Sequence, residues 1–455
     1  MFRRTSIDSS IRATTPSNEL IVKLKADVPT RRALQHLVLA EGTGDRTFAA
    51  AAPREAAFVP STSALEMLVL SGAIESVEPL FDSPGIRRAA GSERLAFAVE
   101  PSGVGEEDTL HILTFRDEDA AERACAALQQ DAKVEYVHRP AERYLMSPGG
   151  VGAKKGARKR SRSRRRTTGR LDPLESRQWG LGAVRWYHAQ KLSTFKDARD
   201  VTIAVIDTGV DAKHPDLQGV VVEEKSFTTG PLKDTKGHGT HVIGILAAVR
   251  NNQIGISGIC ASRRILSLKA LGPYSGVGYY RAIRYAIDQK VSVLNLSLGG
   301  PHDPTEEILI RAAIDSGTVV VAAMGNEFRA GNAPSYPAAL PDVIAVGAST
   351  EIDRRASFSN TGPHITLVAP GENILSTVPT YASELAESTD YDAWPGTSMA
   401  TPFVAATAAL IRARRPKAKV GDVRNALVKG ADKVSGQSGF TEELGHGRLN
   451  VRRSL

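Results

Sequence analysis

The sequence predicts an α/β fold, a mostly parallel sheet with helices on both faces, preceded by a smaller α+β region. Apolar strand-like runs alternate with helical patterns between residues 171 and 455, which is typical of such a sheet. The run 201–206 is almost wholly apolar, as expected for a strand buried on both faces. Before residue 147 the strand patterns are shorter. A chain of 455 residues therefore divides into two or three domains.

The region 171–455 carries the stronger pattern. Its expected elements are strand 201–206, helix 238–249, helix 278–289, strand 291–297, helix 305–316, strand 318–323 and strand 342–347. A further apolar helix begins around Ser398 and should end near Pro416. We expect Pro402 in its first turn, where the missing N–H of proline costs nothing.

The first 146 residues carry a weaker pattern. We expect residues 1–17 to be disordered and residues 18–146 to form an α+β region. Its expected elements are strand 20–25, helix 30–41, helix 61–70, strand 73–80, strands 94–99 and 110–115, helix 118–130 and strand 133–137. The sequences of 74–79 and 134–140 are similar, which suggests two repeated units.

The segment 147–170 is expected to be a disordered linker, because it is rich in glycine and charge. Residues 154–170 contain ten Lys or Arg and no Asp or Glu, and without them the formal net charge of +8 would become −2. The segment is either a solvated spacer, a target for a protease that cuts after basic residues, or a nucleic-acid site. We rank nucleic acid last, because no aromatic residue interrupts the run to stack on bases.

Composition limits the cellular setting. Cys125 and Cys260 lie far apart, so we expect two free thiols and no disulfide framework. The first 20 residues contain arginines but no apolar core, so we expect neither a secretory signal nor a membrane anchor. Cytoplasmic residence is therefore the default expectation, with export by another route left open, and we expect a monomer.

Three blocks of residues suggest chemistry. Ser398 is a small residue near glycine at a helix start, where a lone serine is more often only an N-cap. A serine nucleophile needs a base, and the base needs an orienting acid. Asp207 ends the run 201–206 at the edge of the sheet where catalytic groups gather. His238 opens a helix within a glycine-rich turn, which gives the chain order Asp, His, Ser.

These blocks resemble a known family. The segments 207–209 (DTG), 237–241 (GHGTH) and 396–402 (GTSMATP) are similar to the three catalytic blocks of the subtilisin-like serine proteases. The segments 295–300 (NLSLGG) and 322–326 (AAMGN) resemble that family's substrate-edge strand and oxyanion block. The resemblance implies a serine endopeptidase that works through an acyl-enzyme intermediate on protein or peptide substrates. The rival hypotheses are a catalytically silent binding protein on this scaffold and a nucleic-acid-associated protein.

The resemblance implies a role for each site residue. Ser398 would be the nucleophile, His238 the general base, Asp207 its orienting acid and Asn326 a donor to the oxyanion. The substrate would lie between one edge and an opposite rim, formed respectively by Ser297, Leu298 and Gly299 and by Ser275, Gly276 and Val277. The flanking residues Met324, Phe403 and Trp394-Pro395 depart from the family's commonest flanks, which leaves the shape of the specificity pocket open.

The region before the linker resembles the propeptides of this family. That resemblance implies an autoinhibited zymogen, in which the propeptide assists folding and segment 141–146 lies in the substrate cleft as an intramolecular inhibitor. A first self-cleavage near Met146–Ser147 would follow, since Leu145 and Met146 are large and apolar. The alternative is an unrelated α+β interaction domain.

The segment 250–256 (RNNQIGI) resembles the family's calcium loop. The implied ligands are the carboxylate of Asp216, the amide of Asn252, and the carbonyl groups of Arg250, Ile254 and Ile256, an oxygen set suited to a structural Ca²⁺. Gln178 or Glu175 would complete it. The alternative is that this Asn-rich loop is only a turn.

Overall fold

The computed structural model describes residues 18–25, 64–70, 73–80, 110–145, 171–272, 276–434 and 436–455. Within it, residues 13–141 form one compact unit, and residues 142–455 belong to a second. Several predictions lie outside the described residues: the disordered tail 1–17, helix 30–41, strand 94–99, the cut at Met146–Ser147, the linker 147–170 and the rim residue Ser275.

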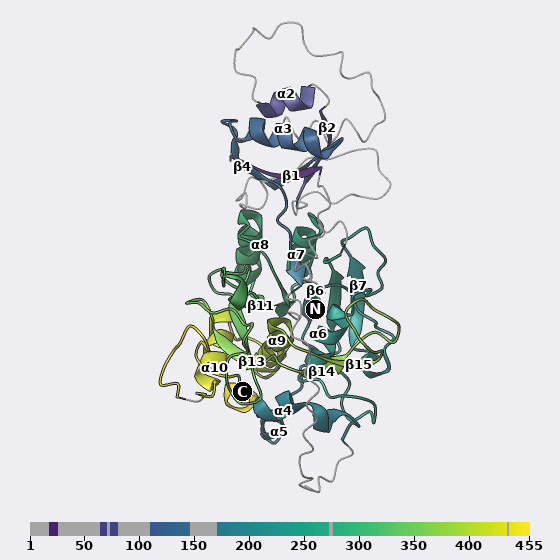
Figure 1. Ribbon diagram of the computed structural model, residues 1–455, viewed down its shortest axis with the longest axis vertical. Helices are drawn as coiled ribbons and strands as arrows, with labels where there is room; N and C mark the ends of the chain where they lie inside the picture. The colour runs from purple at the N-terminus through teal and green to yellow at the C-terminus, as the bar shows by residue number, and fades with distance from the viewer. Residues whose placement is uncertain are drawn as a thin grey trace, which may run out of the picture. The chain divides into compact units, whose positions relative to one another are not determined.

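The smaller unit is a four-stranded antiparallel sheet in the order β2-β3-β1-β4, with helix α3 packed along it (Figure 1). Its elements are β1 (Glu19–Leu24), α2 (Ala64–Leu70), β2 (Ile74–Pro79), β3 (Leu110–Phe115), α3 (Glu118–Leu128) and β4 (Val134–His138). Apolar residues from one face of the sheet and from α3 form its core, among them Leu20, Phe115 and Leu128. Each half of the unit ends in β2 or β4, and these two strands lie at opposite edges of the sheet. The similar segments 74–79 and 134–140 thus both form edge strands of the same sheet. That the unit consists of two repeats stays a prediction.

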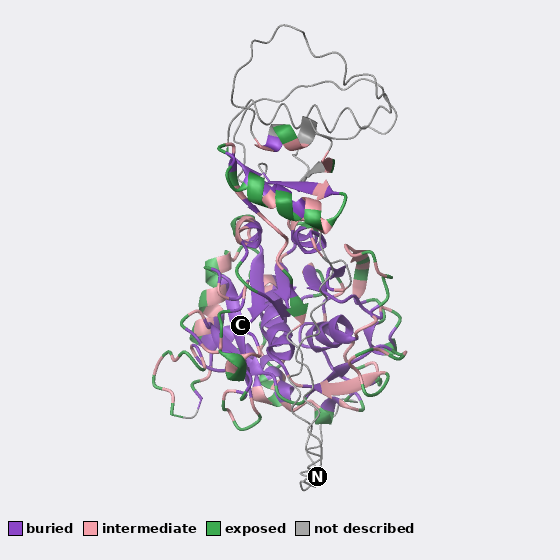
Figure 2. Ribbon diagram, turned by 45° about the horizontal axis from the view of Figure 1, so that its top comes forward, coloured by how far each residue is buried: buried purple, intermediate pink, exposed green. Residues whose placement is uncertain are grey.

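The larger unit is built on a seven-stranded parallel sheet in the order β13-β12-β11-β9-β6-β8-β7. Its strands are β6 (Ile203–Asp207), β7 (Val221–Ser226), β8 (Ile265–Lys269), β9 (Val293–Leu296), β11 (Val319–Ala323), β12 (Ile344–Ser349) and β13 (Leu367–Pro370). Figure 2 shows the interior of this unit as buried. The predicted parallel sheet is therefore confirmed.

Helices flank this sheet. They are α6 (His238–Ala247), α7 (Gly278–Asp288), α8 (Pro304–Asp315), α9 (Thr397–Arg414) and α10 (Val420–Gly430), with the shorter α4 (Trp179–Ala183), α5 (Trp186–Ala189) and α11 (Val451–Ser454). Helix α9 packs against α6 and against β9, β11, β12 and β13, whereas α7 packs against α8 (Figure 1). A hairpin of β14 (Ile374–Thr377) and β15 (Tyr391–Trp394) lies against α6.

The strand order places a crevice at one edge of the sheet. From β6 the chain passes to the edge strand β7, returns to β8, and then crosses to β9 on the other side of β6. Ligands bind outside the carboxyl ends of strands where the order reverses in this way. Asp207 is the last residue of β6, and Ser297 follows the last residue of β9. The predicted catalytic residue Asp207 and the predicted substrate-edge residue Ser297 therefore lie at this reversal of strand order, at the ends of β6 and β9.

Two differences from the predicted elements bear on the site. The expected strand 291–297 is divided, because Ser297 separates β9 from the two-residue strand β10 (Leu298–Gly299). The helix α9 begins at Thr397, so Pro402 lies in its second turn and not in the first. A proline there removes the N–H that would bond to the carbonyl group four residues earlier, that of Ser398.

Two composition-based expectations concern the described residues. Cys125 and Cys260 are both free cysteines. Within the described ranges, no helix is both long and apolar enough to cross a membrane.

Candidate active site

Asp207 and His238 are joined by a hydrogen bond. The Nδ1 atom of His238 lies 2.8 Å from Oδ1 of Asp207, and both side chains are buried. The same carboxylate oxygen accepts the backbone N–H of Thr208 at 2.8 Å. Since Oδ1 can only accept from the ring, Nδ1 carries the proton and Nε2 is the basic nitrogen of neutral His238. The Nε2 atom is buried and has no hydrogen-bond partner among the residues described.

Asp234 joins the segments that carry Asp207 and His238, and its place between them is not evident from the sequence. Its buried carboxylate accepts from the Thr208 hydroxyl at 2.8 Å, from the Gly237 N–H at 2.8 Å, and from Thr240, whose N–H and hydroxyl lie at 3.0 and 2.7 Å. Burial raises the pKa of this carboxyl, and the four donors oppose that shift. The signal in the sequence was an acidic residue shortly before a helix start, which is the ordinary position of a capping residue.

The glycine after the histidine permits close packing. A Cβ atom on Gly239 would lie 2.1 Å from the carbonyl O of Gly209, which is impossible without backbone movement. The first turn of α6 therefore rests directly on the turn that follows Asp207, and this contact sets the short distance between Asp207 and His238.

The histidine block also contacts the segment before the serine. The rings of His241 and Trp394 stack with centroids 4.6 Å apart and an interplanar angle of 3°. Nε2 of His241 lies 3.2 Å from the carbonyl O of Asp392, so it donates there. Burial, and next the nearby His238, lower the pKa of His241 to about 3, which keeps its ring neutral. Trp394, which departs from the family's usual flank, thus packs on α6.

Ser398 and Ser297 exchange hydrogen bonds. The Oγ atom of Ser398 donates to the carbonyl O of Ser297 at 2.9 Å, and Oγ of Ser297 donates to the carbonyl O of Ser398 at 2.9 Å. Both residues are buried. The predicted nucleophile is therefore located beside the end of β9, at the first turn of α9.

Asn326 follows β11 and is oriented by Thr397. Its Oδ1 atom accepts from the N–H of Thr397 at 3.0 Å and from the Thr397 hydroxyl at 2.9 Å. The amide NH₂ of Asn326 is consequently the end turned away from Thr397. Glu327 supports the backbone here by accepting the Asn326 N–H at 2.8 Å.

Part of the predicted substrate edge is paired with another segment of the same unit. Leu298 and Gly299 of β10 form an antiparallel pair with Leu145 and Tyr144 of β5 (Tyr144–Leu145). In the described part of the opposite rim, Val277 is buried and caps the start of α7, and this two-stranded sheet includes no residue of that rim.

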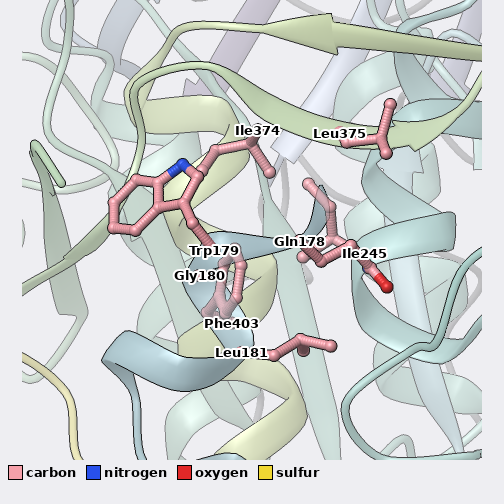
Figure 3. Close-up of a pocket in the computed structure, with 8 residues that line it drawn as sticks. All are labelled: Gln178, Trp179, Gly180, Leu181, Ile245, Ile374, Leu375 and Phe403. Carbon is pink, nitrogen blue, oxygen red and sulfur yellow. The ribbon is translucent and has the colours of Figure 1, made fainter. Parts of the chain in front are cut away.

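Phe403 lines an apolar pocket beside α4. Figure 3 shows a small apolar pocket in which its ring lies near Gly180, and a Cβ atom on Gly180 would be 2.8 Å from Phe403 Cζ. The other lining residues come from α4 and its N-cap, α6 and β14: Gln178, Trp179, Leu181, Ile245, Ile374 and Leu375. Phe403 therefore packs the core side of α9. The buried Met324 follows β11 directly.

Of the predicted calcium residues, Asp216 contacts Asn252 and Ile256 of the loop 250–256. Nδ2 of Asn252 donates to Oδ1 of Asp216 at 2.8 Å, and the Ile256 N–H donates to Oδ2 at 2.7 Å. Oδ1 of Asn252 accepts the Ile254 N–H at 2.8 Å. A half-turn of the Asn252 amide would bring its oxygen beside the carboxylate, and with that turn the two side chains fit a hard cation.

The two residues suggested to complete the set, Gln178 and Glu175, both bond to Ser257, which directly follows this loop. Both amide atoms of Gln178 bond to the backbone of Ser257, and Glu175 accepts the Ser257 hydroxyl at 2.7 Å. Asp172 instead holds the loop, by accepting the N–H groups of Asn251 and Gln253 at 2.9 and 3.0 Å. Across the described residues there is no cluster of three or more His, Cys, Asp or Glu side chains that could hold a metal ion.

Comparisons with known proteins identify the family of the chain. Residues 198–447 match the subtilase family. The chain is 40% identical over 263 residues to subtilisin of Bacillus pumilus, a match that covers 56% of this chain and 90% of that protein. It is 38% identical over 293 residues to thermitase of Thermoactinomyces vulgaris, covering 62% of this chain and 98% of thermitase.

A solved structure is similar as well. Fervidolysin from Fervidobacterium pennivorans, a keratinolytic enzyme related to subtilisin, matches with a TM-score of 0.65 and 26% identity, over 76% of this chain and 56% of that one. The family match covers more than half of the chain and includes Asp207, His238, Asn326 and Ser398. The chain belongs to the subtilase family and is a subtilisin-like serine endopeptidase.

Proposed function

We propose that this endopeptidase cleaves peptide bonds through Asp207, His238 and Ser398, with Asn326 as oxyanion donor, and that it is made as an autoinhibited zymogen. The observation that supports the triad best is the 2.8 Å bond between buried Asp207 and His238, because it fixes the tautomer with a basic Nε2.

The first step uses this basic nitrogen. A rotation about the Cα–Cβ bond of Ser398 turns Oγ from the carbonyl of Ser297 towards Nε2 of His238. Oγ then attacks the substrate carbonyl carbon while Nε2 takes its proton, and the new imidazolium is stabilised by Asp207. The same proton passes to the leaving amine, which leaves an acyl-enzyme that water hydrolyses by the reverse sequence.

The negative oxygen of the tetrahedral intermediate needs donors. The Asn326 amide is oriented for this by Thr397, which binds its oxygen end and thereby aims the NH₂ end elsewhere. The N–H of Ser398 at the start of α9 is the second donor, and the positive end of the helix dipole adds to it. Such preorganised donors need no rearrangement when charge develops.

Autoinhibition is supported by the pairing of β5 with β10. An extended substrate adds to an exposed strand through backbone hydrogen bonds, and Tyr144 and Leu145 already occupy that position on Leu298 and Gly299. The match to fervidolysin covers 76% of this chain, more than residues 171–455 alone provide, which supports a counterpart of the N-terminal region there. In this proposal segment 141–146, called the inhibitory tail below, occupies the acyl side of the substrate cleft until the chain is cut.

The test compares the full-length chain with its Ser398→Ala variant. Each is incubated with casein, and the intact mass of each chain is then recorded. We expect the wild type to digest casein and to shorten between residues 146 and 170, while Ser398→Ala stays whole and inactive. If the wild type stays whole, limited trypsin treatment of the basic linker should release activity. Continued inactivity after nicking would overturn the zymogen proposal.

The loop 250–256 is proposed as a structural calcium site, held by Asp216, by the turned amide of Asn252 and by loop carbonyl groups. Bound calcium would stabilise the loop and take no part in the reaction. Equilibrium dialysis of the full-length Ser398→Ala chain should find bound calcium, and a chelator should lower its melting temperature. An Asp216→Asn variant should lose both effects. Dialysis without bound calcium would contradict the proposal.

A further inference from the structure

Arg143, just before β5, is buried in a pocket of the larger unit. Its Nε lies 2.9 Å from Oε1 of Glu306, and its Nη2 lies 2.8 Å from Oε2, so the guanidinium and the carboxylate form a two-pronged pair. The two side chains are 1% and 0% exposed. Nη1 also donates to the carbonyl O of Pro301 at 3.1 Å. Arg143 is therefore bound to the larger unit by an ion pair that water does not reach.

The rest of the pocket is shaped for a guanidinium. The Cζ atom of Arg143 lies 5.5 Å from the ring centroid of Tyr279, and the Tyr279 hydroxyl donates to Oε1 of Glu306 at 2.7 Å. A Cβ atom on Gly300 would lie 2.5 Å from Nη1 of Arg143 and 2.6 Å from the carbonyl O of Glu142. Glycine at position 300 is thus what leaves room for the arginine.

The α8 start holds the carboxylate in place. Glu306 lies in the first turn of α8, and its N–H donates to Oδ1 of the N-cap Asp303 at 2.8 Å. The hydroxyl of Tyr280 donates to Oδ2 of Asp303 at 2.6 Å. Glu306 is therefore fixed by its own helix and by Tyr279, independently of the inhibitory tail. Within the described residues, Arg143 is the cation that forms an ion pair with it.

We infer that this pocket is a substrate subsite that selects arginine, at the residue just before the one that pairs with Gly299. The inference rests on the proposed function, since it requires that substrates replace β5 on β10. With a cut after Met146, the selected arginine is the fourth residue before the broken bond. The inhibitory tail would then be held by the same contact that selects substrates.

The chemistry explains why arginine is preferred. A neutral or apolar residue would leave the Glu306 carboxylate buried without a counter-charge, which is strongly unfavourable. Lysine would bring a charge but not the planar fork that matches both carboxylate oxygens. Burial raises the pKa of Glu306, and Arg143 opposes this shift.

The test uses the activated full-length chain and internally quenched peptides with the sequence of residues 141–147. The arginine is kept or replaced by citrulline, lysine or leucine. A desolvated ion pair at an interface can raise binding affinity by a large factor. We therefore expect kcat/KM for the arginine peptide to exceed that for the citrulline peptide about 100-fold. Glu306→Gln should reduce this ratio to about 5-fold or less. Glu307→Gln, whose partners Arg311 and His302 lie at the surface, is the matched control and should keep the full ratio.

The outcomes separate the inference from the proposed function. If casein is digested but the arginine and citrulline peptides are cleaved equally, the pocket is not selective and the inference fails, while the proposed function stands. If neither casein nor any peptide is cleaved, the proposed function fails. Peptide binding then decides the inference: the Arg143→Ala, Ser398→Ala chain should bind the labelled arginine peptide about 30-fold more tightly than the citrulline peptide, by fluorescence anisotropy. Equal affinities would overturn it.

Discussion

The hydroxyl of Ser297 donates a 2.9 Å hydrogen bond to the carbonyl O of Ser398. In an uninterrupted helix that carbonyl would accept the N–H of residue 402, which is a proline and has none. Ser297 thus supplies the donor that the helix lacks. The side chain of Ser398 returns a bond of equal length to the carbonyl O of Ser297, so the end of β9 and the start of α9 are joined twice.

Ser297→Ala should destabilise the chain by about 1–3 kcal/mol, since it removes the hydroxyl that donates to the buried carbonyl of Ser398. Thermal unfolding in a Ser398→Ala background, which avoids self-digestion, measures the effect. The control is Pro402→Ala added to Ser297→Ala, because the restored N–H can bond to the same carbonyl. We expect this second change to recover much of the loss. A double variant no more stable than Ser297→Ala would refute the explanation.

Asn326→Ala should lower kcat about 100- to 1,000-fold with little change in KM, a magnitude established for the equivalent donor in subtilisin itself. Thr397→Val should lower kcat about 10-fold, because one of the two donors to the Asn326 oxygen is removed and the amide is less well oriented. Steady-state kinetics on a peptide substrate checks both variants. A rise in KM at constant kcat would show that Asn326 binds the substrate equally in the ground state and the transition state.

Asp234→Asn should destabilise the chain by about 2–3 kcal/mol and lower kcat, since an amide NH₂ would face donors that the carboxylate now accepts from. Chemical denaturation gives the free energy of unfolding, and kinetics at a permissive temperature gives kcat. Glu384→Gln is the control: its surface pair with Lys236 should contribute little. Equal effects of the two variants would show that the Asp234 carboxylate does not stabilise the chain or position His238.

The lowered pKa of His241 should make the folded chain less stable in acid. Its pKa is about 3 in the folded chain, below the value of about 6.5 expected when unfolded. Below pH 6.5 the unfolded chain therefore binds a proton that the folded chain does not, so this contribution is complete above pH 6.5 and falls as the pH decreases. Between pH 6 and 4.5 the free energy of unfolding should fall by about 2 kcal/mol from this group alone.

The matched variant for the acid effect is His241→Gln in the Ser398→Ala chain, since glutamine keeps a donor for the Asp392 carbonyl and does not titrate in this range. Its free energy of unfolding should depend less on pH between 6 and 4.5 than that of the Ser398→Ala chain. The same pH dependence in both chains would mean that His241 is not the group responsible.

The sequence was informative where chemistry is local. Asp207 at a strand end and Ser398 at a helix start were identifiable from neighbouring residues, as was the alternation that gives the parallel sheet. The strand β7 was missed, because Glu223, Glu224 and Lys225 make an edge strand look like a polar loop. Edge strands carry such charges because one side of them stays unpaired.

Long-range contacts could not be predicted from local patterns. The bonds between Ser297 and Ser398 join residues 101 positions apart, and the bond from Arg143 to Glu306 spans 163 positions. The start of α9 at Thr397 lies within one residue of the expected position, but Pro402 lies five residues after it, so the proline falls in the second turn. The role of Asp234 cannot be predicted from neighbouring residues either, because its partners include Thr208, on a different segment.

The central claim is that Ser398 is a nucleophile activated by His238. The most direct measurement is labelling of the full-length chain, nicked in the 147–170 linker, with an organophosphate, followed by peptide mapping of the adduct by mass spectrometry. We expect a single modified serine at position 398, with no label in Ser398→Ala and a greatly reduced rate in His238→Ala. A label on another serine, or equal labelling of the wild type and His238→Ala, would contradict it.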